Sequence, residues 1–199
     1  HSYEDRVSKY IDPNNKFVML GLFDGHSGKS SSVHLSDKHN GLLAFIAKRL
    51  EKHKITPSLL NECFVDFDNK KLKHLESGST ATVLYIDKKQ AIIANVGDSP
   101  AYSIQYTDEC KVQQLSTEHD YFNLKERNRV SNLSKRSKVW DDQRVHGIIQ
   151  CSRGMGDFEI KQMEPGIFIN NPSVAVIKKT DLKNIKYLMI TSDGVTDPF

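Results

Sequence analysis

The chain has 199 residues, of which 27% are charged and 38% hydrophobic, and its formal net charge at pH 7 is +3. A chain of this length can bury a sizeable core, and its sequence has no apolar segment long enough to span a membrane. Lysine and arginine are mixed with acidic residues along the chain, so we expect no nucleic-acid partner.

The three cysteines, Cys63, Cys110 and Cys151, lie far apart in the sequence. They form neither a C-x-x-C pair nor a zinc-binding spacing. Unpaired cysteines of this kind are typical of a reduced protein inside the cell, which here would mean the cytoplasm or the nucleus.

Apolar periodicity divides the chain into strands and helices. Runs of Val, Ile, Leu, Phe and Tyr indicate strands, whereas apolar residues spaced three and four apart indicate helices. Thr56 followed by Pro57 is typical of a helix start. In chain order the patterns predict a strand at Phe17–Phe23, helices at Gly41–His53 and from Pro57 toward Leu72, strands at Thr80–Ile86, Ala91–Val96, Ala101–Tyr106 and Lys111–Leu115, a charged helix at Leu124–Leu133, a strand or strand pair at Arg144–Cys151, and strands at Val174–Ile177 and Tyr187–Thr191.

The order of these elements is that of an α+β protein. Strands follow one another as hairpins, joined at Asp87–Lys89 and around Thr107–Glu109, and do not alternate strictly with helices. No repeat, linker or low-complexity segment divides the chain. We therefore expect a single domain over residues 1–199.

Three of the predicted strands end close to an aspartate: Asp24 in L-F-D-G, Asp98 in N-V-G-D and Asp193 in I-T-S-D-G. Carboxylates that meet at one sheet edge repel each other unless cations lie between them. Ligand sets made only of oxygen favour Mg²⁺, Mn²⁺ or Ca²⁺ over zinc. Asp-Gly is also ordinary turn sequence, and periodicity alone does not show that the three residues converge.

Six short motifs follow one another along the chain. They are Y-E-D at Tyr3–Asp5, F-D-G-H-S-G at Phe23–Gly28, S-G-S-T-A at Ser77–Ala81, A-N-V-G-D-S at Ala94–Ser99, C-S-R-G-M-G-D at Cys151–Asp157 and T-S-D-G-V-T-D at Thr191–Asp197. In this order they resemble the metal-dependent protein serine/threonine phosphatases of type 2C. The resemblance implies a four-layer α-β-β-α sandwich, with two central antiparallel sheets flanked by helices and metals at one end.

The resemblance also implies metal ligands. Asp5 and Asp24 would bind a central pair of Mg²⁺ or Mn²⁺ ions, with Asp24 bridging them. Gly25 would offer its backbone carbonyl, and Glu4 would contact a water of the metal shell rather than the metal itself.

The remaining motif residues have implied roles as well. Asp193 would complete the shell of one metal, and Asp98 together with Asp193 would serve a third, weaker site. His26 would be the general acid that protonates the leaving alcohol. Arg153 and Asp157 would order the nearby loop.

The activity implied by the resemblance is hydrolysis of phosphoserine and phosphothreonine in phosphoprotein substrates by a metal-activated water, and we expect a monomer. The family's phosphate-binding arginine precedes the Glu-Asp pair, and its last metal-binding aspartate follows the S-D-G motif, so neither position falls within this sequence. We therefore expect residues 1–199 to be a phosphatase catalytic domain that is incomplete at both ends.

Two other classes of function stay open. Pro100 stands where the family usually has arginine, and two ligand positions are missing, so a weak or inactive pseudophosphatase that acts as a binding or scaffold module is the main alternative. A calcium-binding structural module is the third, although the sequence has no EF-hand loop and such a module would give His26 no role.

Overall fold

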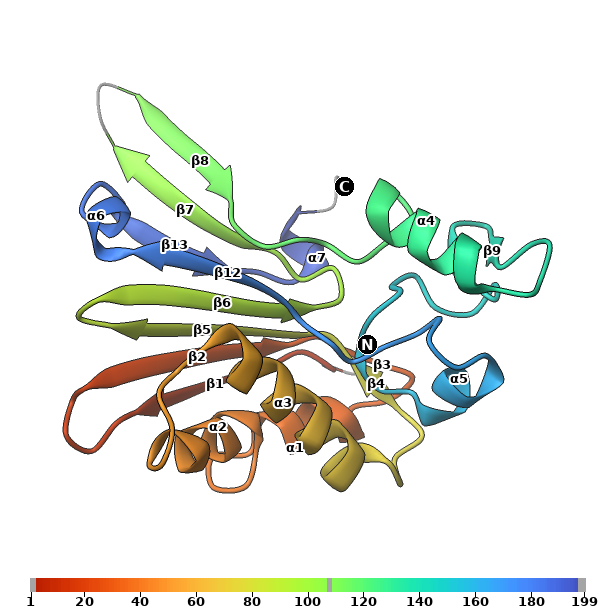
Figure 1. Ribbon diagram of the computed structural model, residues 1–199, viewed down its shortest axis with the longest axis horizontal. Helices are drawn as coiled ribbons and strands as arrows, with labels where there is room; N and C mark the ends of the chain where they lie inside the picture. The colour runs from red at the N-terminus through yellow and green to blue at the C-terminus, as the bar shows by residue number, and fades with distance from the viewer. Residues whose placement is uncertain (1–2, 107–108, 197–199) are drawn as a thin grey trace.

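The computed structural model describes residues 3–106 and 109–196. Within these ranges the chain forms two antiparallel sheets, a layer of helices and a peripheral segment at one end of the sheets (Figure 1). Every helix in the described ranges is too short or too polar to cross a bilayer.

The larger sheet has five antiparallel strands in the order β1-β2-β5-β6-β12. The inner strand β2 is apolar along its whole length because both of its faces are covered, one by helices and the other by the second sheet. The β5–β6 turn is closed by Asp87, whose Oδ1 accepts hydrogen bonds from the backbone of Lys89 and Gln90 at 2.6 and 2.9 Å. The strands span β1 Arg6–Ile11, β2 Phe17–Phe23, β5 Ala81–Asp87, β6 Gln90–Val96 and β12 Ser173–Lys178.

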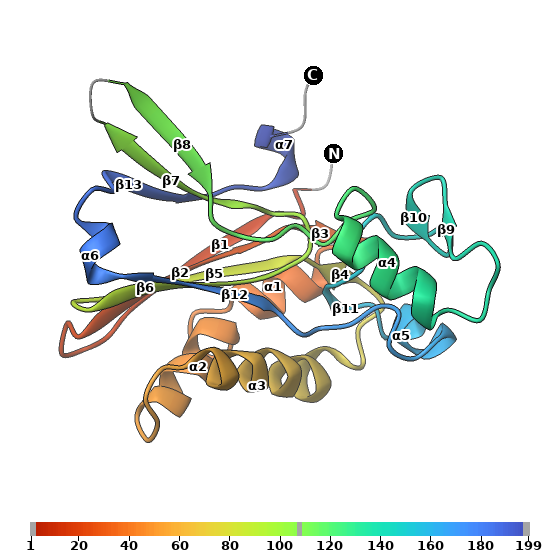
Figure 2. The ribbon, with the colours of Figure 1, turned by 45° about the horizontal axis from the view of Figure 1, so that its top comes forward.

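Three helices cover one face of this sheet, as Figure 2 shows beneath the strands. Thr56 caps the longest of them, since its Oγ1 accepts a hydrogen bond from the backbone N–H of Leu59 at 3.1 Å, and Pro57 takes the first helical position. Phe23, Phe64 and Phe67 are among the fully buried side chains of the resulting core. The elements are α1 Ser30–Ser36, α2 Leu42–Leu50, α3 Pro57–Phe67 and η1 Asp68–Leu72, a turn of π-helix that continues α3.

The second sheet lies against the other face of the first and has the order β13-β7-β8. Leu84 and Ile93 of the first sheet pack with Ala101 and Leu188 of the second, which defines a core between the sheets. Its strands are β7 Ala101–Tyr106, β8 Cys110–Gln114 and β13 Tyr187–Ile190. The predicted connection at Thr107–Glu109 includes Thr107 and Asp108, which lie outside the described residues.

This arrangement confirms a mixed α+β fold with antiparallel sheets. The expected four layers are present only in part: within residues 3–106 and 109–196, no helical layer comparable to α1–α3 covers the outer face of the second sheet, and β8 is exposed along its length. The complete sandwich stays a prediction for the longer domain.

The peripheral segment differs most from the sequence expectation. The strand or strand pair predicted at Arg144–Cys151 is largely wrong, because Arg144–Val145 forms only a two-residue ladder with Trp140–Asp141, and Ile149 forms only an isolated bridge with Val145. Asp142, Gln143, His146 and Gly147 have positive φ, so the chain turns repeatedly and cannot continue a strand. The elements of this region are α4 Leu124–Leu133, β9 Trp140–Asp141, β10 Arg144–Val145 and α5 Phe158–Met163.

A three-stranded ribbon joins the sheets to this periphery in the order β11-β4-β3. Its register places Gly78 of the central strand opposite both His26 and Gly156. Two further short helices follow near the end of the chain. These elements are β3 Gly25–His26, β4 Gly78–Ser79, β11 Met155–Gly156, α6 Lys179–Leu182 and α7 Asp193–Thr196.

Candidate active site

Asp24 follows the last residue of β2 and is held by its own backbone. Its N–H donates to Thr80 Oγ1 at 3.1 Å, and its carbonyl accepts from the N–H of Thr80 at 2.8 Å and from the hydroxyl of Ser79 at 3.0 Å. The position of Asp24 is therefore set by the neighbouring strand, as the sequence predicted for an aspartate at a strand end.

Two other carboxyls reach Asp24 from distant parts of the chain. Arg6 pairs with Phe23 in the β1–β2 register, which brings Asp5 beside Asp24. The side chains of Asp5 and Asp193 both interact with the Asp24 carboxyl. Burial and these two neighbours raise the pKa of Asp24 to about 8.

Asp193 reaches this cluster in a different way from the one predicted. β13 ends at Ile190, and Asp193 is the first residue of the one-turn helix α7 rather than a residue at the strand end. The backbone N–H of Thr191 donates to the carbonyl of Pro100 at 3.0 Å, so the chain continues past the first residue of β7 toward Asp24. Asp197, the last residue of the T-S-D-G-V-T-D motif, lies outside the described residues.

Asp98 follows β6 in a turn that requires glycine. Gly97 has φ of +96°, and a Cβ there would approach Thr80 Cγ2 to 2.7 Å. Burial raises the pKa of Asp98, and a hydrogen bond from the thiol of Cys151 acts in the opposite direction. The hydroxyls of Thr80 and Ser99 lie 2.7 Å apart, so one side chain links the backbone of Asp24 to the residue after Asp98.

Asp24, Asp98 and Asp193 line one cavity of about 210 Å³. Four carboxyls, an imidazole, a thiol and a guanidinium contribute to its lining, from Asp24, Asp98, Asp157, Asp193, His26, Cys151 and Arg144. A wider cleft of about 570 Å³ lies at the opposite end of the larger sheet, among the β1–β2 and β5–β6 turns, and contains none of the predicted site residues.

The donor set of this cavity fits a hard divalent cation. In the described part of the chain, no group of three His, Cys, Asp or Glu side chains is arranged to hold a metal ion as it stands. All of the donors around Asp24 are carboxyl oxygens, which suit Mg²⁺ or Mn²⁺. A cation bound between neighbouring carboxylates offsets their mutual repulsion.

Glu4 and Gly25 lie next to this cluster. The Glu4 carboxylate accepts a hydrogen bond from the backbone N–H of Gly28 at 3.1 Å, and its carbonyl accepts from Ser32 Oγ at 2.6 Å. A Cβ on Gly25 would lie 2.8 Å from Ser32 Oγ and 3.0 Å from the Glu4 carbonyl, so the backbone packs closely there. The two residues thus form part of the wall between β1 and α1.

His26 forms an ion pair with Asp157. Its Nε2 lies 2.7 Å from Asp157 Oδ2, and the Asp157 side chain is only 4% exposed. Burial lowers the pKa of His26, but the hydrogen bond and charge of Asp157 outweigh it, so the pKa lies above its ordinary value. A Cβ on Gly78 would overlap both Asp157 Oδ2 and His26 Nε2, so the pair lies directly against the backbone of β4.

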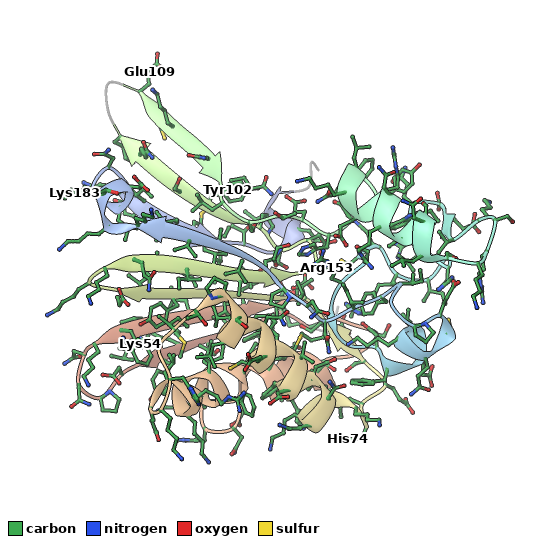
Figure 3. All side chains as sticks on the ribbon, viewed as in Figure 1. Lys54, His74, Tyr102, Glu109, Arg153 and Lys183 are labelled. Carbon is green, nitrogen blue, oxygen red and sulfur yellow. The ribbon has the colours of Figure 1, made fainter. Side chains whose placement is uncertain are left out.

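Arg153 contacts a buried glutamate on the charged helix that the sequence predicted at Leu124–Leu133. Glu126 is 4% exposed and accepts hydrogen bonds from Arg153, from Arg129 and from the hydroxyl of Ser152. Arg153 lies between the sheets and α4 in Figure 3, and its Nη1 also donates to the carbonyl of Asn171 at 2.9 Å. These contacts tie α4 to the loop that carries Cys151.

His119 is a supporting residue that the sequence pattern did not single out. Its Nδ1 accepts a hydrogen bond from the backbone N–H of Gly97 at 3.2 Å, and the backbone N–H of His119 donates to the Gly97 carbonyl at 3.1 Å. Its ring is fully buried and also bonds Ser173 Oγ at 2.8 Å. His119 therefore fixes the turn before Asp98. In the sequence, only its position directly before Asp120 could have pointed to this role.

The fold and the cavity define a class: an α+β protein whose antiparallel sheets bring acidic residues together at one end. The family model described as protein phosphatase 2C matches residues 1–199. The chain therefore belongs to the protein phosphatase 2C family.

Individual relatives agree with this assignment. The chain is 26% identical to protein phosphatase 1L of Bos taurus, covering 98% of this chain and 56% of the relative, and 32% identical to probable protein phosphatase 2C 17 of Arabidopsis thaliana, covering 98% and 69%. The chain spans about half the length of most of the curated relatives it matches.

Solved structures support the fold alone, because their sequence identities are low. A sex-determining protein of C. elegans superposes with a TM-score of 0.83 at 22% identity, covering 100% of this chain and 50% of that one. Serine-threonine phosphatase 2C from Toxoplasma gondii superposes with a TM-score of 0.73 at 16% identity, covering 99% and 75%.

Proposed function

We propose that residues 1–199 are the greater part of a catalytic domain that hydrolyses phosphoserine and phosphothreonine in phosphoproteins. The observation that carries the proposal is that the side chains of Asp5 and Asp193, from distant segments of the chain, lie beside the Asp24 carboxyl, and that Asp24 and Asp193 line one cavity. Such a cluster is costly without a cation, and phosphomonoester hydrolysis by this family uses one.

In this proposal the acidic residues hold Mg²⁺ or Mn²⁺. Asp5 and Asp24 would hold the central pair of ions together with the Gly25 carbonyl, Asp193 would add a ligand to one of them, and Asp98 with Asp193 would serve a third, weaker site. Glu4 contacts a water of the shell. When bound, divalent cations would screen the charge of the phosphate and lower the pKa of an attacking water.

The remaining groups of the cavity act on the substrate. His26 donates a proton to the serine or threonine oxygen as the phosphorus–oxygen bond breaks, and a positioned general acid typically contributes about 10²–10⁴-fold. Asp157 holds the imidazole through its Nε2 atom, which leaves Nδ1 to face the substrate. The rigid backbone of β2 and β4 keeps these groups in place before the substrate arrives.

The test is phosphate release from a phosphothreonine peptide by the full-length protein. We expect turnover with Mn²⁺, loss of turnover with EDTA, and a loss of at least about 10²-fold in Asp24→Ala. Asp181→Asn is the matched control, because Asp181 lies in α6 and outside the cavity. Absence of turnover by the full-length protein with Mn²⁺ would exclude the enzymatic function.

A pseudophosphatase with the same fold is the second candidate. Two observations favour it: among the described residues no group of three His, Cys, Asp or Glu side chains is arranged to hold a metal ion, and Pro100 takes the position of the family's arginine. A calorimetric titration separates the two candidates, since a scaffold without metal ligands would give no heat of Mn²⁺ binding.

Location and partners follow from the same proposal. All three cysteines are free, which agrees with a reducing compartment such as the cytoplasm or nucleus. Phosphoproteins are the proposed partners, and a monomeric state, the complete four-layer sandwich and the extent of the catalytic domain beyond residues 1–199 are predictions for the full-length protein.

A further inference from the structure

Asp68 is a fully buried aspartate at the junction of α3 and η1, and the function proposed above gives it no role. Its Oδ1 accepts a hydrogen bond from the backbone N–H of Gly156 at 2.6 Å. Its Oδ2 accepts from Lys161 Nζ and from Asn170 Nδ2, both at 2.6 Å. A buried carboxylate is costly unless it is fully paired, and all three donors of this one lie in the segment 156–170.

Lys161 is held in a largely buried ion pair with Asp68. Its side chain is 13% exposed, and its ammonium lies 4.8 Å from the ring centre of Phe158 and 5.6 Å from that of Phe168. Burial lowers the pKa of Lys161, and the charge of Asp68 opposes that effect. The ammonium is therefore stable in this place only while the Asp68 carboxylate is charged and close to it.

The segment held by Asp68 contains a strained turn. Gly156 has φ of +78° and Asp157 has φ of +50°, so two successive residues are left-handed, and the second of them is not glycine. Asp68 holds the N–H of Gly156 just before Asp157. Through Lys161 it also holds the first turn of α5, where the N–H of Lys161 donates to the carbonyl of Asp157 at 3.1 Å.

The side chain of Asp157 leads from this turn to the cavity, where its Oδ2 lies 2.7 Å from His26 Nε2. We propose that Asp68 is a positioning residue for His26, which fixes the Gly156–Asp157 turn and thereby the carboxylate that orients the imidazole. This inference rests on the proposed function, in which His26 is the general acid. Asp68 touches neither the substrate nor the carboxyl cluster, so it acts only through Asp157.

A loss of general-acid alignment has a chemical signature. A threonine alkoxide leaves only if it is protonated, whereas the nitrophenolate of p-nitrophenyl phosphate leaves without a proton. A misplaced His26 therefore slows hydrolysis of the phosphothreonine peptide and leaves hydrolysis of p-nitrophenyl phosphate nearly unchanged. A general loss of folded protein or of bound metal lowers the rate of hydrolysis of both substrates by the same factor.

The experiment compares kcat for these two substrates in the full-length protein with Mn²⁺. Asp68→Asn keeps an acceptor for Gly156 but removes the charge that balances Lys161, and it should lower kcat for the peptide about tenfold and for p-nitrophenyl phosphate less than about twofold. His26→Ala is the reference variant. It should also lower kcat more for the peptide than for p-nitrophenyl phosphate, and by a larger factor than Asp68→Asn. Asp66→Asn is the matched control, since Asp66 lies on the same helix and pairs at the surface with Lys70. Equal losses on both substrates, or no loss, would overturn the proposal.

A second readout uses the metal-free protein. Asp157→Asn should move the imidazole ¹⁵N resonances of His26, and Asp68→Asn should move them in the same direction while the other histidines stay in place. An unmoved His26 resonance would overturn the positioning. A moved resonance, together with a His26→Ala variant that shows no preference between the two substrates, would instead contradict the general-acid role of His26 and leave the positioning intact.

A variant that keeps the buried charge pair covers the case in which Asp68→Asn does not fold. Asn170→Ala removes one amide donor from Asp68 Oδ2 and leaves Lys161 paired. We expect a selective loss of about two- to fivefold on the peptide. If Asp68→Asn is unfolded and Asn170→Ala changes neither the substrate preference nor the His26 resonance, the proposal is wrong.

Discussion

The Nε2 atom of His26 lies 2.7 Å from Oδ2 of Asp157, although the two residues are 131 positions apart in the sequence. The pair lies against the backbone of Gly78, where no larger residue would fit. The imidazole is thus fixed in direction before any substrate binds, which is the property required of a general acid.

Removal of the Asp157 carboxylate tests this relationship. We expect Asp157→Asn to lower kcat for a phosphothreonine peptide by about 10- to 100-fold with KM changed less than about threefold, because the imidazole stays but loses its partner. Steady-state kinetics measure the split. Glu159→Gln, an exposed position on the same helix, is the control. A change confined to KM would show that Asp157 serves substrate binding instead.

The hydroxyl of Thr80 should matter for stability, because it accepts from the N–H of Asp24 and lies 2.7 Å from Ser99 Oγ. Thr80→Val removes a buried hydrogen-bond partner from the Asp24 N–H and from the Ser99 hydroxyl. Such a loss typically lowers the free energy of unfolding by about 1–3 kcal/mol. Urea denaturation of the metal-free protein measures the loss. Thr80→Ser keeps the hydroxyl and should retain most of the stability; a valine variant as stable as the wild type would contradict the bridge.

The folded protein should lose stability in mild acid. Burial, followed by the nearby charge of Arg153, lowers the pKa of His119 from 6.5 to about 3, so the unfolded chain binds a proton between these values and the folded chain does not. Stability is then complete above pH 6.5 and falls as the pH drops toward 3.

Glu126 adds to this effect at lower pH. Burial acts to raise its pKa, but hydrogen bonds from Arg153 and Ser152 outweigh burial and lower the pKa from 4.5 to about 2. Urea midpoints at pH 7, 6 and 5 should decrease steadily, and His119→Gln should flatten that decrease. An identical slope in the variant would mean that His119 is not the group responsible.

Arg144 is an exposed arginine that lines the cavity with Asp24, Asp98 and His26. A guanidinium there can bind phosphate oxygens, so we expect Arg144→Ala to raise KM for the phosphopeptide by up to about tenfold with little change in kcat. Arg144→Lys should recover part of the loss, because it keeps the charge without the planar fork. Arg136→Ala, in the same peripheral segment but outside the cavity, should leave KM unchanged.

Local patterns predicted the elements whose apolar residues are regular. The strand at Phe17–Phe23, the β5–β6 hairpin and the cap at Thr56 are confirmed because each depends on residues close in sequence. The strand Arg6–Ile11 and the helix Ser30–Ser36 were not expected. The first, R-V-S-K-Y-I at a sheet edge, does not alternate polar and apolar residues, and the second is rich in serine, so tertiary packing rather than local preference stabilises both.

Local sequence predicted part of the candidate site, and the rest depends on contacts between distant segments. Asp24 and Asp98 were expected at strand ends and lie in one cavity, and the register of β1 explains why Asp5 joins Asp24. The ribbon that pairs His26 with Asp157, however, forms from three two-residue strands that carry no periodic signal. Its existence depends on glycines that allow close approach of the chains, which a sequence pattern does not distinguish from turn glycines.

The most direct test of the account is a calorimetric titration of Mn²⁺ into the full-length protein and into Asp24→Asn. If Asp24 is the residue around which the acidic groups bind cations, the wild type should take up at least two ions, and the variant should bind them more than about tenfold more weakly. The same Mn²⁺ affinity and ion number in both proteins would contradict the metal site, and with it the proposed hydrolysis.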